Sequence, residues 1–250
     1  MRDNDQILSA GDVHVWLARP GATHRTDAWP SILAVSERVR LRAFRLEADR
    51  ELFFLSRIVL RTSLSLYEPV APADWRFEVA ANGRPHVAAP AGTGDLEFSI
   101  SHTAGLVAIA IGRTARLGVD VESLYSMSEI LNIASTVMTS RELDELANCE
   151  ESDRACTLLR HWVLKEALSK ACSLGLAMPF DRVGFRLGGE DPKLCMAPEE
   201  LVGDHSRWKF TELNLGSGHV GALATEHGLH VHLREWPAAL TATFPGSRVD

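Results

Sequence analysis

The pattern of apolar and polar positions predicts strands and one long helix in the first half of the chain. Strict alternation, or a short apolar run bounded by turn residues, indicates strands over residues 13–18, 75–80, 98–101 and 106–111. Residues 51–67 instead carry apolar side chains at helical spacing, and Asn82-Gly83 is a turn signal. The first half is therefore predicted to run strand, helix, then strands.

The same order recurs in the second half of the chain. A strand is expected at residues 118–122, then helices at 128–137, 140–149 and 153–172, then strands at 183–187, 208–215, 220–224 and 229–233. The join falls near Arg113–Arg116. This repetition predicts an α+β fold that is pseudo-dimeric, with two similar α+β subdomains at residues 1–115 and 116–250.

The composition is that of an ordinary globular protein and excludes several classes. The 250 residues are 46% hydrophobic and 24% charged, which excludes a disordered or collagen-like chain. No window approaches the roughly 20 consecutive apolar residues of a membrane span, and the acidic first residues predict no secretory signal. The four cysteines form no C-x-x-C pair, so we expect reduced thiols and a cytoplasmic location.

Charge is unevenly distributed along the chain. The formal net charge of −7 argues against a general nucleic-acid binder. Between Ser36 and Arg61, however, seven arginines stand against four acidic residues, which gives this stretch a charge of +3 and leaves −10 elsewhere. The stretch is either a solvated helix face with Arg–Glu pairs or an anion site, because guanidinium groups suit phosphate.

Two carboxylates alternate with valines in Gly118-Val119-Asp120-Val121-Glu122. On a strand, Asp120 and Glu122 point to the same face and the valines point to the other. Acids on a wet strand face would explain the pattern without any function. Two neighbouring anions repel, however, unless a cation or base lies between them, and a hard divalent cation such as Mg²⁺ would satisfy both.

The segment from Trp162 to Lys170 adds a third carboxylate and a cation. Glu166 and Lys170 are four residues apart, so they are neighbours on the surface of a helix. The pair is either an ordinary Glu–Lys helix pair or a metal carboxylate beside a cation for phosphate. The helical phase predicts one buried stripe made of Leu159, Val163, Ala167 and Ala171.

The strand segment Phe98-Ser99-Ile100-Ser101-His102 ends in a polar pair. A Ser–His hydrolase would be expected to carry a G-x-S-x-G elbow, which neither serine has. Ser101 and His102 therefore suit hydrogen bonding to a phosphate better than nucleophilic attack.

Together these segments resemble the 4′-phosphopantetheinyl transferases. The strand 118–122 followed by the helix segment 162–170 is similar to the signature pair of that family. Gly83-Arg84-Pro85 and residues 98–102 are similar to two further blocks of its Sfp-type branch. The early helix of that branch, which bears arginines, is similar to Asp49-Arg50, Arg57 and Leu60-Arg61. The length resembles the monomeric, pseudo-dimeric branch rather than the short trimeric holo-acyl-carrier-protein synthases.

The resemblance implies a reaction and a metal site. The enzyme would move the 4′-phosphopantetheine arm of coenzyme A onto a serine of an apo acyl or peptidyl carrier protein, a holo-[acyl-carrier-protein] synthase activity, and release 3′,5′-ADP. Asp120, Glu122 and Glu166 match the carboxylates that hold Mg²⁺ or Mn²⁺. Glu166 also matches the proposed general base, and Lys170 matches a lysine that neutralises phosphate or protonates the leaving group. The expected catalytic residues are Glu166, Lys170 and Asp120.

The resemblance also implies the coenzyme A contacts. Arg40, with Arg50 as the weaker candidate, would meet the 3′-phosphate, and residues 83–85 would form the loop over the adenine end. The full expected set is Arg40, Arg50, Gly83, Arg84, Pro85, Ser101, His102, Lys165 and Lys170. The active site would then lie at the interface of the subdomains, with coenzyme A contacts from the first and metal and catalytic residues from the second.

In the family the segment after the metal strand meets the carrier protein. Here that segment is residues 123–131, and its apolar side chains are Leu124, Tyr125, Met127, Ile130 and Leu131. We expect hydrophobic docking of a transient carrier-protein partner onto a monomeric enzyme, with no nucleic-acid or membrane partner. Fatty-acid, polyketide and nonribosomal-peptide carriers are all open, and the Sfp-type branch favours secondary metabolism.

Two other function classes are open. The fold could be a non-catalytic module that binds coenzyme A or a carrier protein, although intact Asp120, Glu122, Glu166 and Lys170 argue against this. It could also be a Mg²⁺-dependent phosphohydrolase that uses the same carboxylates with water as nucleophile. Cleavage of coenzyme A without a carrier protein would indicate the hydrolase.

Overall fold

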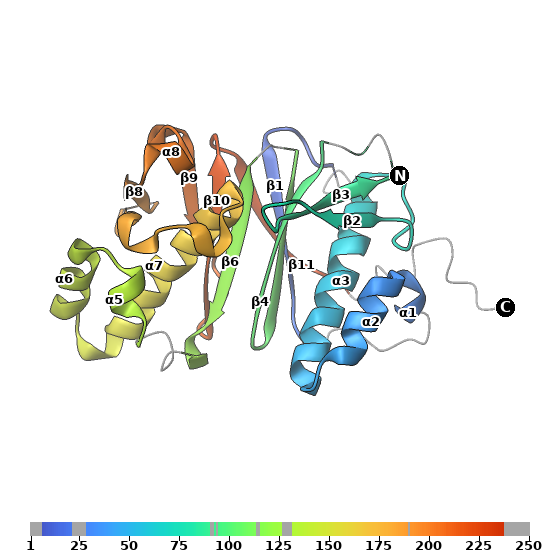
Figure 1. The fold of residues 1–250 in the computed structure, drawn as a ribbon, viewed down its shortest axis with the longest axis horizontal. Helices are drawn as coiled ribbons and strands as arrows, with labels where there is room; N and C mark the ends of the chain where they lie inside the picture. The colour runs from blue at the N-terminus through green and yellow to red at the C-terminus, as the bar shows by residue number, and fades with distance from the viewer. Residues whose placement is uncertain are drawn as a thin grey trace.

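Two β-sheets form the centre of the molecule, and one long helix covers the outer face of each (Figure 1). The computed structural model describes residues 7–21, 29–90, 93, 95–113, 116–126, 132–189 and 191–237. The layers run helix α3, first sheet, second sheet, helix α7. The predicted α+β class is confirmed. None of the helices in these ranges is long and apolar enough to cross a membrane.

The first half supplies most of the first sheet and its helix. Its elements are β1 (Asp12–Ala18), α1 (Trp29–Ile32), α2 (Val35–Ala43), α3 (Glu47–Tyr67), β2 (Arg76–Val79), β3 (Pro85–Ala89), β4 (Glu97–Thr103) and β5 (Leu106–Gly112). The sheet order is β11-β1-β5-β4, and β2 and β3 form a separate hairpin. Strand β5 is buried along its whole length because it has helix α3 on one face and the second sheet on the other.

The second half supplies the second sheet and helix α7. Its strands and α-helices are β6 (Leu117–Ser123), α5 (Ala134–Val137), α6 (Ser140–Asn148), α7 (Glu151–Cys172), β7 (Gly184–Arg186), β8 (Lys193–Met196), α8 (Glu199–Val202), β9 (Trp208–Glu212), β10 (His219–Glu226) and β11 (His230–Glu235). In the described part of the second half, 3₁₀ turns accompany them at Leu124–Ser126, Gly175–Ala177, Phe180–Arg182 and His205–Arg207. The second sheet has the order β6-β10-β9 and is antiparallel throughout.

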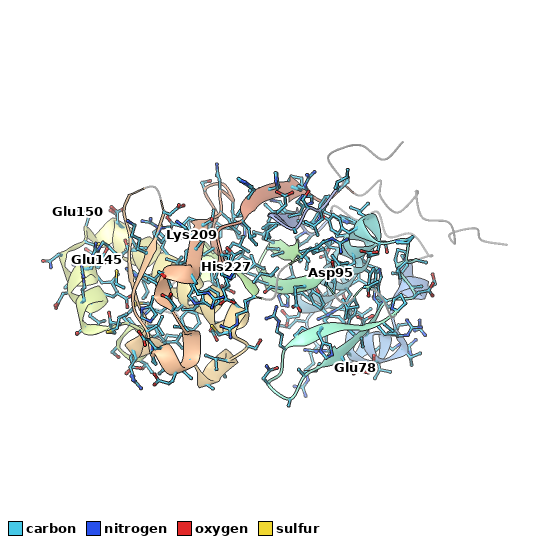
Figure 2. The ribbon with its side chains drawn as sticks, turned by 90° about the horizontal axis from the view of Figure 1, so that it is seen from above. Glu78, Asp95, Glu145, Glu150, Lys209 and His227 are labelled. Atoms are coloured by element: carbon cyan, nitrogen blue, oxygen red, sulfur yellow. The ribbon has the colours of Figure 1, made fainter. Side chains whose placement is uncertain are left out.

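The last strand crosses from the second half into the first sheet. Strand β11 pairs in parallel with β1, from Asp12 opposite His230 to Leu17 opposite Glu235. The two sheets therefore divide the chain near residue 116 with this one exchange. A boundary at residues 115 and 116, with pseudo-symmetry between the halves, stays a prediction. In Figure 2, seen from above, Glu78 marks the β2–β3 hairpin on the first half, and Glu145 and Glu150 mark the far end of the second.

Gly118 brings helix α7 directly against strand β6. A Cβ atom at this position would overlap the carbonyl oxygen of Ala167 and come within 2.6 Å of the Ala171 nitrogen. Only glycine allows so close an approach of helix to strand. The predicted stripe of α7 is confirmed, because its four side chains are at most 1% exposed. Lys170 lies next to this stripe, because its Cβ is also 3.0 Å from the position of a Gly118 Cβ.

Several element boundaries differ from the sequence expectation. Helix α3 begins at Glu47 rather than at residue 51, and α2 precedes it within the arginine-rich stretch. The short strands β3 and β8, which each complete a hairpin, were not expected. Of the helix expected over residues 128–137, the described part is α5, and residues 127–131 lie outside the described ranges.

Candidate active site at the seam between the sheets

Strand β6 of the second sheet runs beside strand β4 of the first, and the line along which they meet is the seam between the sheets (Figure 1). Asp120 of β6 lies at this seam, because its side chain contacts Ser101 of β4. Its side chain is 6% exposed. Its Oδ1 accepts hydrogen bonds from Ser101 Oγ at 2.8 Å and from Lys170 Nζ at 2.7 Å. Its Oδ2 is buried and has no hydrogen-bond partner in the described part of the chain. One carboxylate oxygen of Asp120 is thus held by two hydrogen bonds, and the other is available to bind a ligand.

Helix α7 presents a half-buried row of three side chains to this seam: Trp162, Glu166 and Lys170, spaced four residues apart. The Lys170 ammonium also donates to the carbonyl oxygens of Val119 at 3.1 Å and Ile100 at 3.4 Å. Lys170 therefore bridges β4 and β6 as well as pairing with Asp120. Lys170 thus contacts Asp120, and the charges of Asp120 and Glu122 act on Glu166, so the helix pair lies beside the strand carboxylates. The functional role of the Glu166–Lys170 pair stays a prediction.

The carboxylates disfavour one another's charge. Burial, followed by the charges of Asp120 and Glu122, raises the pKa of Glu166 to about 7 although Lys170 opposes the shift. Burial and the charge of Asp120 also raise the pKa of Glu122, while the side chains of Thr103 and Trp162 oppose that shift. A cation bound between these carboxylates would therefore relieve their mutual repulsion.

The donor set suits a divalent cation, although no closed cage is preformed. Within the described ranges, no group of three or more His, Cys, Asp or Glu side chains is gathered closely enough to hold a metal ion. Nevertheless, Asp120 Oδ2 is buried without a partner there, and Asp120 raises the pKa of Glu122 and Glu166. Carboxylate oxygens of this kind are the preferred ligands of Mg²⁺ and Mn²⁺. The chemistry of these residues therefore fits such an ion, and the three carboxylates would have to move closer together to bind it.

A cavity of about 310 Å³ opens beside Lys170. Its lining comes from the β2–β3 turn, from β4 and from the end of α7, and includes Gly83, Pro85, Phe98, Ile100 and Lys170. Gly83 adopts φ +85°, a left-handed conformation that glycine accommodates without strain. The lining is largely apolar with one ammonium, which suits a flat ring or an alkyl chain that carries a phosphate.

Arg84 holds the β2–β3 turn against helix α7. Its guanidinium donates to Ala171 O and Ser173 Oγ, both at 3.3 Å, and to Glu97 Oε2 at 2.9 Å. Ala171 O is one of the last carbonyls of α7, where a cation is stabilised by the helix dipole. Arg84 therefore lines the first cavity while its charged group is engaged in joining the two halves of the molecule.

A second cavity, of about 390 Å³, lies on the other side of the same turn and is lined by four arginines. These are Arg40, Arg57, Arg61 and Arg76. Arg61 is fully buried and pairs with Glu37 at 2.7 Å. Arg40 and Arg57 instead flank the ring of Phe53, at 5.2 and 5.1 Å from its centroid. Burial, followed by the neighbouring Arg40 and Arg61, lowers the pKa of Arg57 against the opposing charge of Glu37.

His102 lies in the positive field that links the two cavities. Partial burial and then the charges of Lys170, Arg57 and Arg40 lower its pKa, and Asp49 opposes the shift. Three cations from α2, α3 and α7 are therefore close enough to act on the His102 imidazole of β4. Such a field attracts a ligand with several phosphates.

The structure does not bring every expected residue to the site. Arg50 lines neither cavity, and its guanidinium donates to Glu47 and to the Phe44 carbonyl. Lys165 is fully buried, and its ammonium donates to Val137 O and Glu142 Oε2 at 2.6 Å and to Phe180 O at 2.9 Å. We therefore assign Lys165 to the frame of the second half, not to the coenzyme A contacts that the resemblance implied.

Two residues at the site were not expected. Arg57 lines the second cavity, and its Nε is buried with no partner among the described residues. The sequence marked it only as one arginine of the early helix. Thr103 contacts the carboxylate of Glu122 at 3.3 Å. The alternation of Ser99, Ser101 and Thr103 along one strand was the signal that could have found it, because alternate residues share a face.

Comparison with known proteins places the chain in a family. A model of the 4′-phosphopantetheinyl transferase superfamily matches residues 116–240. The 4′-phosphopantetheinyl transferase HetI of Nostoc sp. is 28% identical over 205 residues, which cover 79% of this chain and 85% of that protein. The 4′-phosphopantetheinyl transferase Sfp of Bacillus subtilis is 23% identical over 213 residues, or 85% and 91% of the two chains.

A solved holo-(acyl-carrier-protein) synthase from Bacillus anthracis, in complex with CoA (3′,5′-ADP), matches more distantly. It is 17% identical with a TM-score of 0.36, over 44% of this chain and 93% of that one. The matched family model spans half of the chain and includes the three carboxylates and Lys170. The chain belongs to the 4′-phosphopantetheinyl transferase superfamily, as its motifs predicted.

Proposed function

We propose that this protein transfers 4′-phosphopantetheine from coenzyme A to a serine hydroxyl of an apo carrier protein, with the help of a divalent cation. The observation that carries the proposal is the meeting of Asp120, Glu122 and Glu166 with Lys170 at one seam. An arginine-lined cavity shares Gly83 and Pro85 with the cavity that opens beside Lys170. One chain supplies both sides of the site, so a monomer is sufficient.

Coenzyme A fits the two cavities by charge. Arg40 and Arg57 offer guanidinium groups for the 3′-phosphate, which they can bind by charge-assisted hydrogen bonds. The apolar lining between Gly83 and Phe98 suits the adenine ring or the pantetheine chain. The pyrophosphate then lies near His102 and Lys170, within the positive field described above.

The proposed reaction exchanges one P–O bond for another. The serine Oγ attacks the phosphorus that bears pantetheine, the bond from that phosphorus to the bridging oxygen breaks, and 3′,5′-ADP leaves. Asp120, Glu122 and Glu166 would hold the cation, whose chemistry when bound is to neutralise and polarise the pyrophosphate. Lys170 adds positive charge beside the leaving phosphate, where charge develops in the transition state.

Glu166 is the proposed acceptor of the serine proton. A serine hydroxyl is a weak nucleophile at neutral pH, so a base within hydrogen-bond reach is useful. Without a bound cation, burial and the neighbouring carboxylates raise the pKa of Glu166 to about 7. A cation held by the same carboxylates would favour the ionised form of Glu166, which is the form that can accept the serine proton.

The test is intact-protein mass spectrometry of apo carrier domains incubated with this protein, coenzyme A and Mg²⁺. Fatty-acid, polyketide and peptide carriers are each offered, with Mn²⁺ in parallel. We expect a gain of one phosphopantetheinyl group, lost with EDTA and with Asp120→Ala. If no carrier gains mass while coenzyme A is consumed, the protein is a hydrolase. If coenzyme A is bound but stays intact, it is a binding module.

Arg57 is expected to select for the 3′-phosphate of coenzyme A. Arg57→Gln should raise the KM for coenzyme A by about 10- to 100-fold, the value of a hydrogen bond to a charged group, and leave the KM for dephospho-coenzyme A nearly unchanged. Steady-state kinetics with both substrates measures the ratio. Arg42→Gln, on the exposed side of α2, is the matched control. An equal rise for both substrates would show that Arg57 does not contact the 3′-phosphate.

The carrier protein is proposed to dock beside the end of strand β6. Tyr125 lies there in the turn Leu124–Ser126, and it is 90% exposed. The turn is held in place, since Leu124 N donates to Gly218 O and Tyr125 N donates to Ser123 Oγ. Met127, Ile130 and Leu131, the other apolar residues of the expected docking segment, lie outside the described ranges. An exposed tyrosine on a fixed turn is a suitable anchor for a protein partner.

Tyr125→Ser is expected to raise the KM for the carrier protein about tenfold, because an anchor residue contributes more than about 1 kcal/mol to binding. The KM for coenzyme A should not change. The matched control is Met196→Ser, which removes another exposed apolar side chain on β8, outside both cavity linings. An unchanged carrier KM in Tyr125→Ser would remove this turn from the docking surface.

A further inference from the structure

A row of hydroxyl groups, rather than a backbone ladder, joins strand β4 to strand β6. Val119 N donates to Ser99 Oγ at 3.1 Å, Val121 N to Ser101 Oγ at 3.2 Å, and Ser123 N to Thr103 Oγ1 at 3.1 Å. The three hydroxyl residues alternate along β4, so they share one face. The two strands belong to different sheets, and each hydroxyl takes the place of a carbonyl acceptor.

This row satisfies backbone groups that would otherwise be buried without partners. The side chains of Ser99, Ser101 and Thr103 belong to residues that are only 7%, 6% and 9% exposed, so water is a poor substitute for them. A buried N–H without an acceptor costs about 1–3 kcal/mol. All three hydroxyls therefore have the same structural role, which is to accept a hydrogen bond from a backbone N–H of β6.

Two of the three hydroxyls also donate a hydrogen bond to a carboxylate. A hydroxyl has one proton to donate, and Ser101 gives it to Asp120 Oδ1 at 2.8 Å. Thr103 gives its proton to Glu122 Oε2 at 3.3 Å. No carboxylate contact is found for Ser99 among the described residues, because the position before Val119 is Gly118. The carboxylates that receive these protons are the two strand ligands of the proposed metal site.

We infer that Ser101 and Thr103 are positioning residues, which fix Asp120 and Glu122 from the first half of the chain so that both can bind one divalent cation. The inference rests on the proposed function and assigns Ser101 to the metal carboxylates instead of to a phosphate. Such partners behind a ligand hold its orientation, and their loss typically costs 10- to 100-fold in metal affinity. Because the row crosses the seam, the metal site also depends on the contact between the two halves.

Thr103 offers the cleaner substitutions. Thr103→Val keeps the volume and the β-branch but removes both the donor and the acceptor. Thr103→Ser keeps the hydroxyl and should rescue the function. Ser99→Ala is the matched control, since it removes the same kind of acceptor from the same row without touching a carboxylate. Ser101→Ala is the second test and acts on Asp120 in place of Glu122.

The measurement is the dissociation constant of coenzyme A by titration calorimetry, with Mg²⁺ and with EDTA. The ratio of the two constants reports how strongly metal and coenzyme A support each other's binding. We expect Thr103→Val and Ser101→Ala to reduce that ratio about tenfold, and Thr103→Ser to restore it. Ser99→Ala should keep the wild-type ratio, even where its melting temperature or its affinity for coenzyme A falls. Melting curves confirm that each variant is folded.

The outcomes separate this inference from the proposed function. If wild-type protein binds coenzyme A equally well with Mg²⁺ and with EDTA, the metal part of the proposed function is wrong, and so is the inference. If wild type shows the ratio and Thr103→Val and Ser101→Ala keep it, the inference alone is overturned. If Ser99→Ala loses the ratio as well, the row acts only by joining the strands, and the positioning role is again overturned.

Discussion

Glu166→Gln is expected to lower kcat by about 10³-fold or more while leaving the protein folded. The amide cannot accept the serine proton, and loss of a general base alone typically costs 10²- to 10⁴-fold. Loss of one charged metal ligand adds to this. Single-turnover transfer to an apo carrier domain, followed by mass spectrometry, measures the rate of the chemical step.

The same substitution should not destabilise the metal-free protein. The pKa of Glu166 is raised to about 7 in the folded state from an ordinary value of 4.5, so its ionised form costs stability above that pH. In EDTA at pH 8, Glu166→Gln is therefore expected to melt at or above the wild-type temperature. Glu200→Gln, exposed on α8, is the control for a change of charge alone. Normal turnover in Glu166→Gln would remove Glu166 from the mechanism.

Lys165→Met is expected to lower the free energy of unfolding by about 3–5 kcal/mol, the cost of leaving one partner of a buried ion pair without the other. Glu142 is 1% exposed and is the centre of this network. Its Oε2 accepts from Lys165 and from Thr139, which caps helix α6, and its Oε1 accepts from Phe185 N at 2.9 Å. Urea unfolding of wild type and variant measures the difference.

A surface pair on the same helix gives the comparison. Arg160 pairs with Glu212 at 2.6 Å, with both side chains about one third exposed, so Arg160→Met should cost about 1 kcal/mol or less. If Lys165 were instead a coenzyme A contact, Lys165→Met would raise the KM for coenzyme A and leave the free energy of unfolding unchanged. That result would contradict the structural role.

The loss of unfolding free energy caused by Lys165→Met should depend on pH. Burial raises the pKa of Glu142, but its contacts with His161 and Lys165 outweigh burial and lower it from 4.5 to about 2. The ionised carboxylate therefore stabilises the fold fully above pH 4.5, and this contribution is lost as the pH falls toward 2. The difference between wild type and Lys165→Met should narrow over the same range.

The sequence predicted the elements that carry a strong apolar pattern, and it missed the second strands of two short hairpins and the long-range pairing of β11 with β1. Helix α7 was expected because apolar residues recur along it at helical spacing, and strand β5 was expected from its short continuous apolar run. Strands β3 and β8 are short, and β3 begins with Pro85, so neither has a pattern of its own. The pairing of β11 with β1 joins the two ends of the described chain, and no local signal encodes such a contact.

The site shows the same division. The carboxylate spacing on β6 and the Glu166–Lys170 spacing on α7 are local, and both were interpreted from the sequence. The structural role of Lys165 could not be predicted from the sequence, because its burial depends on Glu142 from α6 and on the turn at Phe180. Arg57 and Arg50 lie on one helix, and only the packing of the β2–β3 hairpin decides which of them faces the cavity.

The exchange of strand β11 has a consequence for synthesis of the protein. During translation β1 leaves the ribosome long before its edge partner β11, because every other described helix and strand lies between them in the sequence. Until β11 is made, one edge of β1 has unpaired backbone N–H and C=O groups, which can pair with strands of other chains. A gene cut between the two halves would leave that edge open permanently. Separate expression of the halves is therefore expected to give aggregation-prone fragments, and co-expression should recover a soluble complex only when the second fragment retains β11.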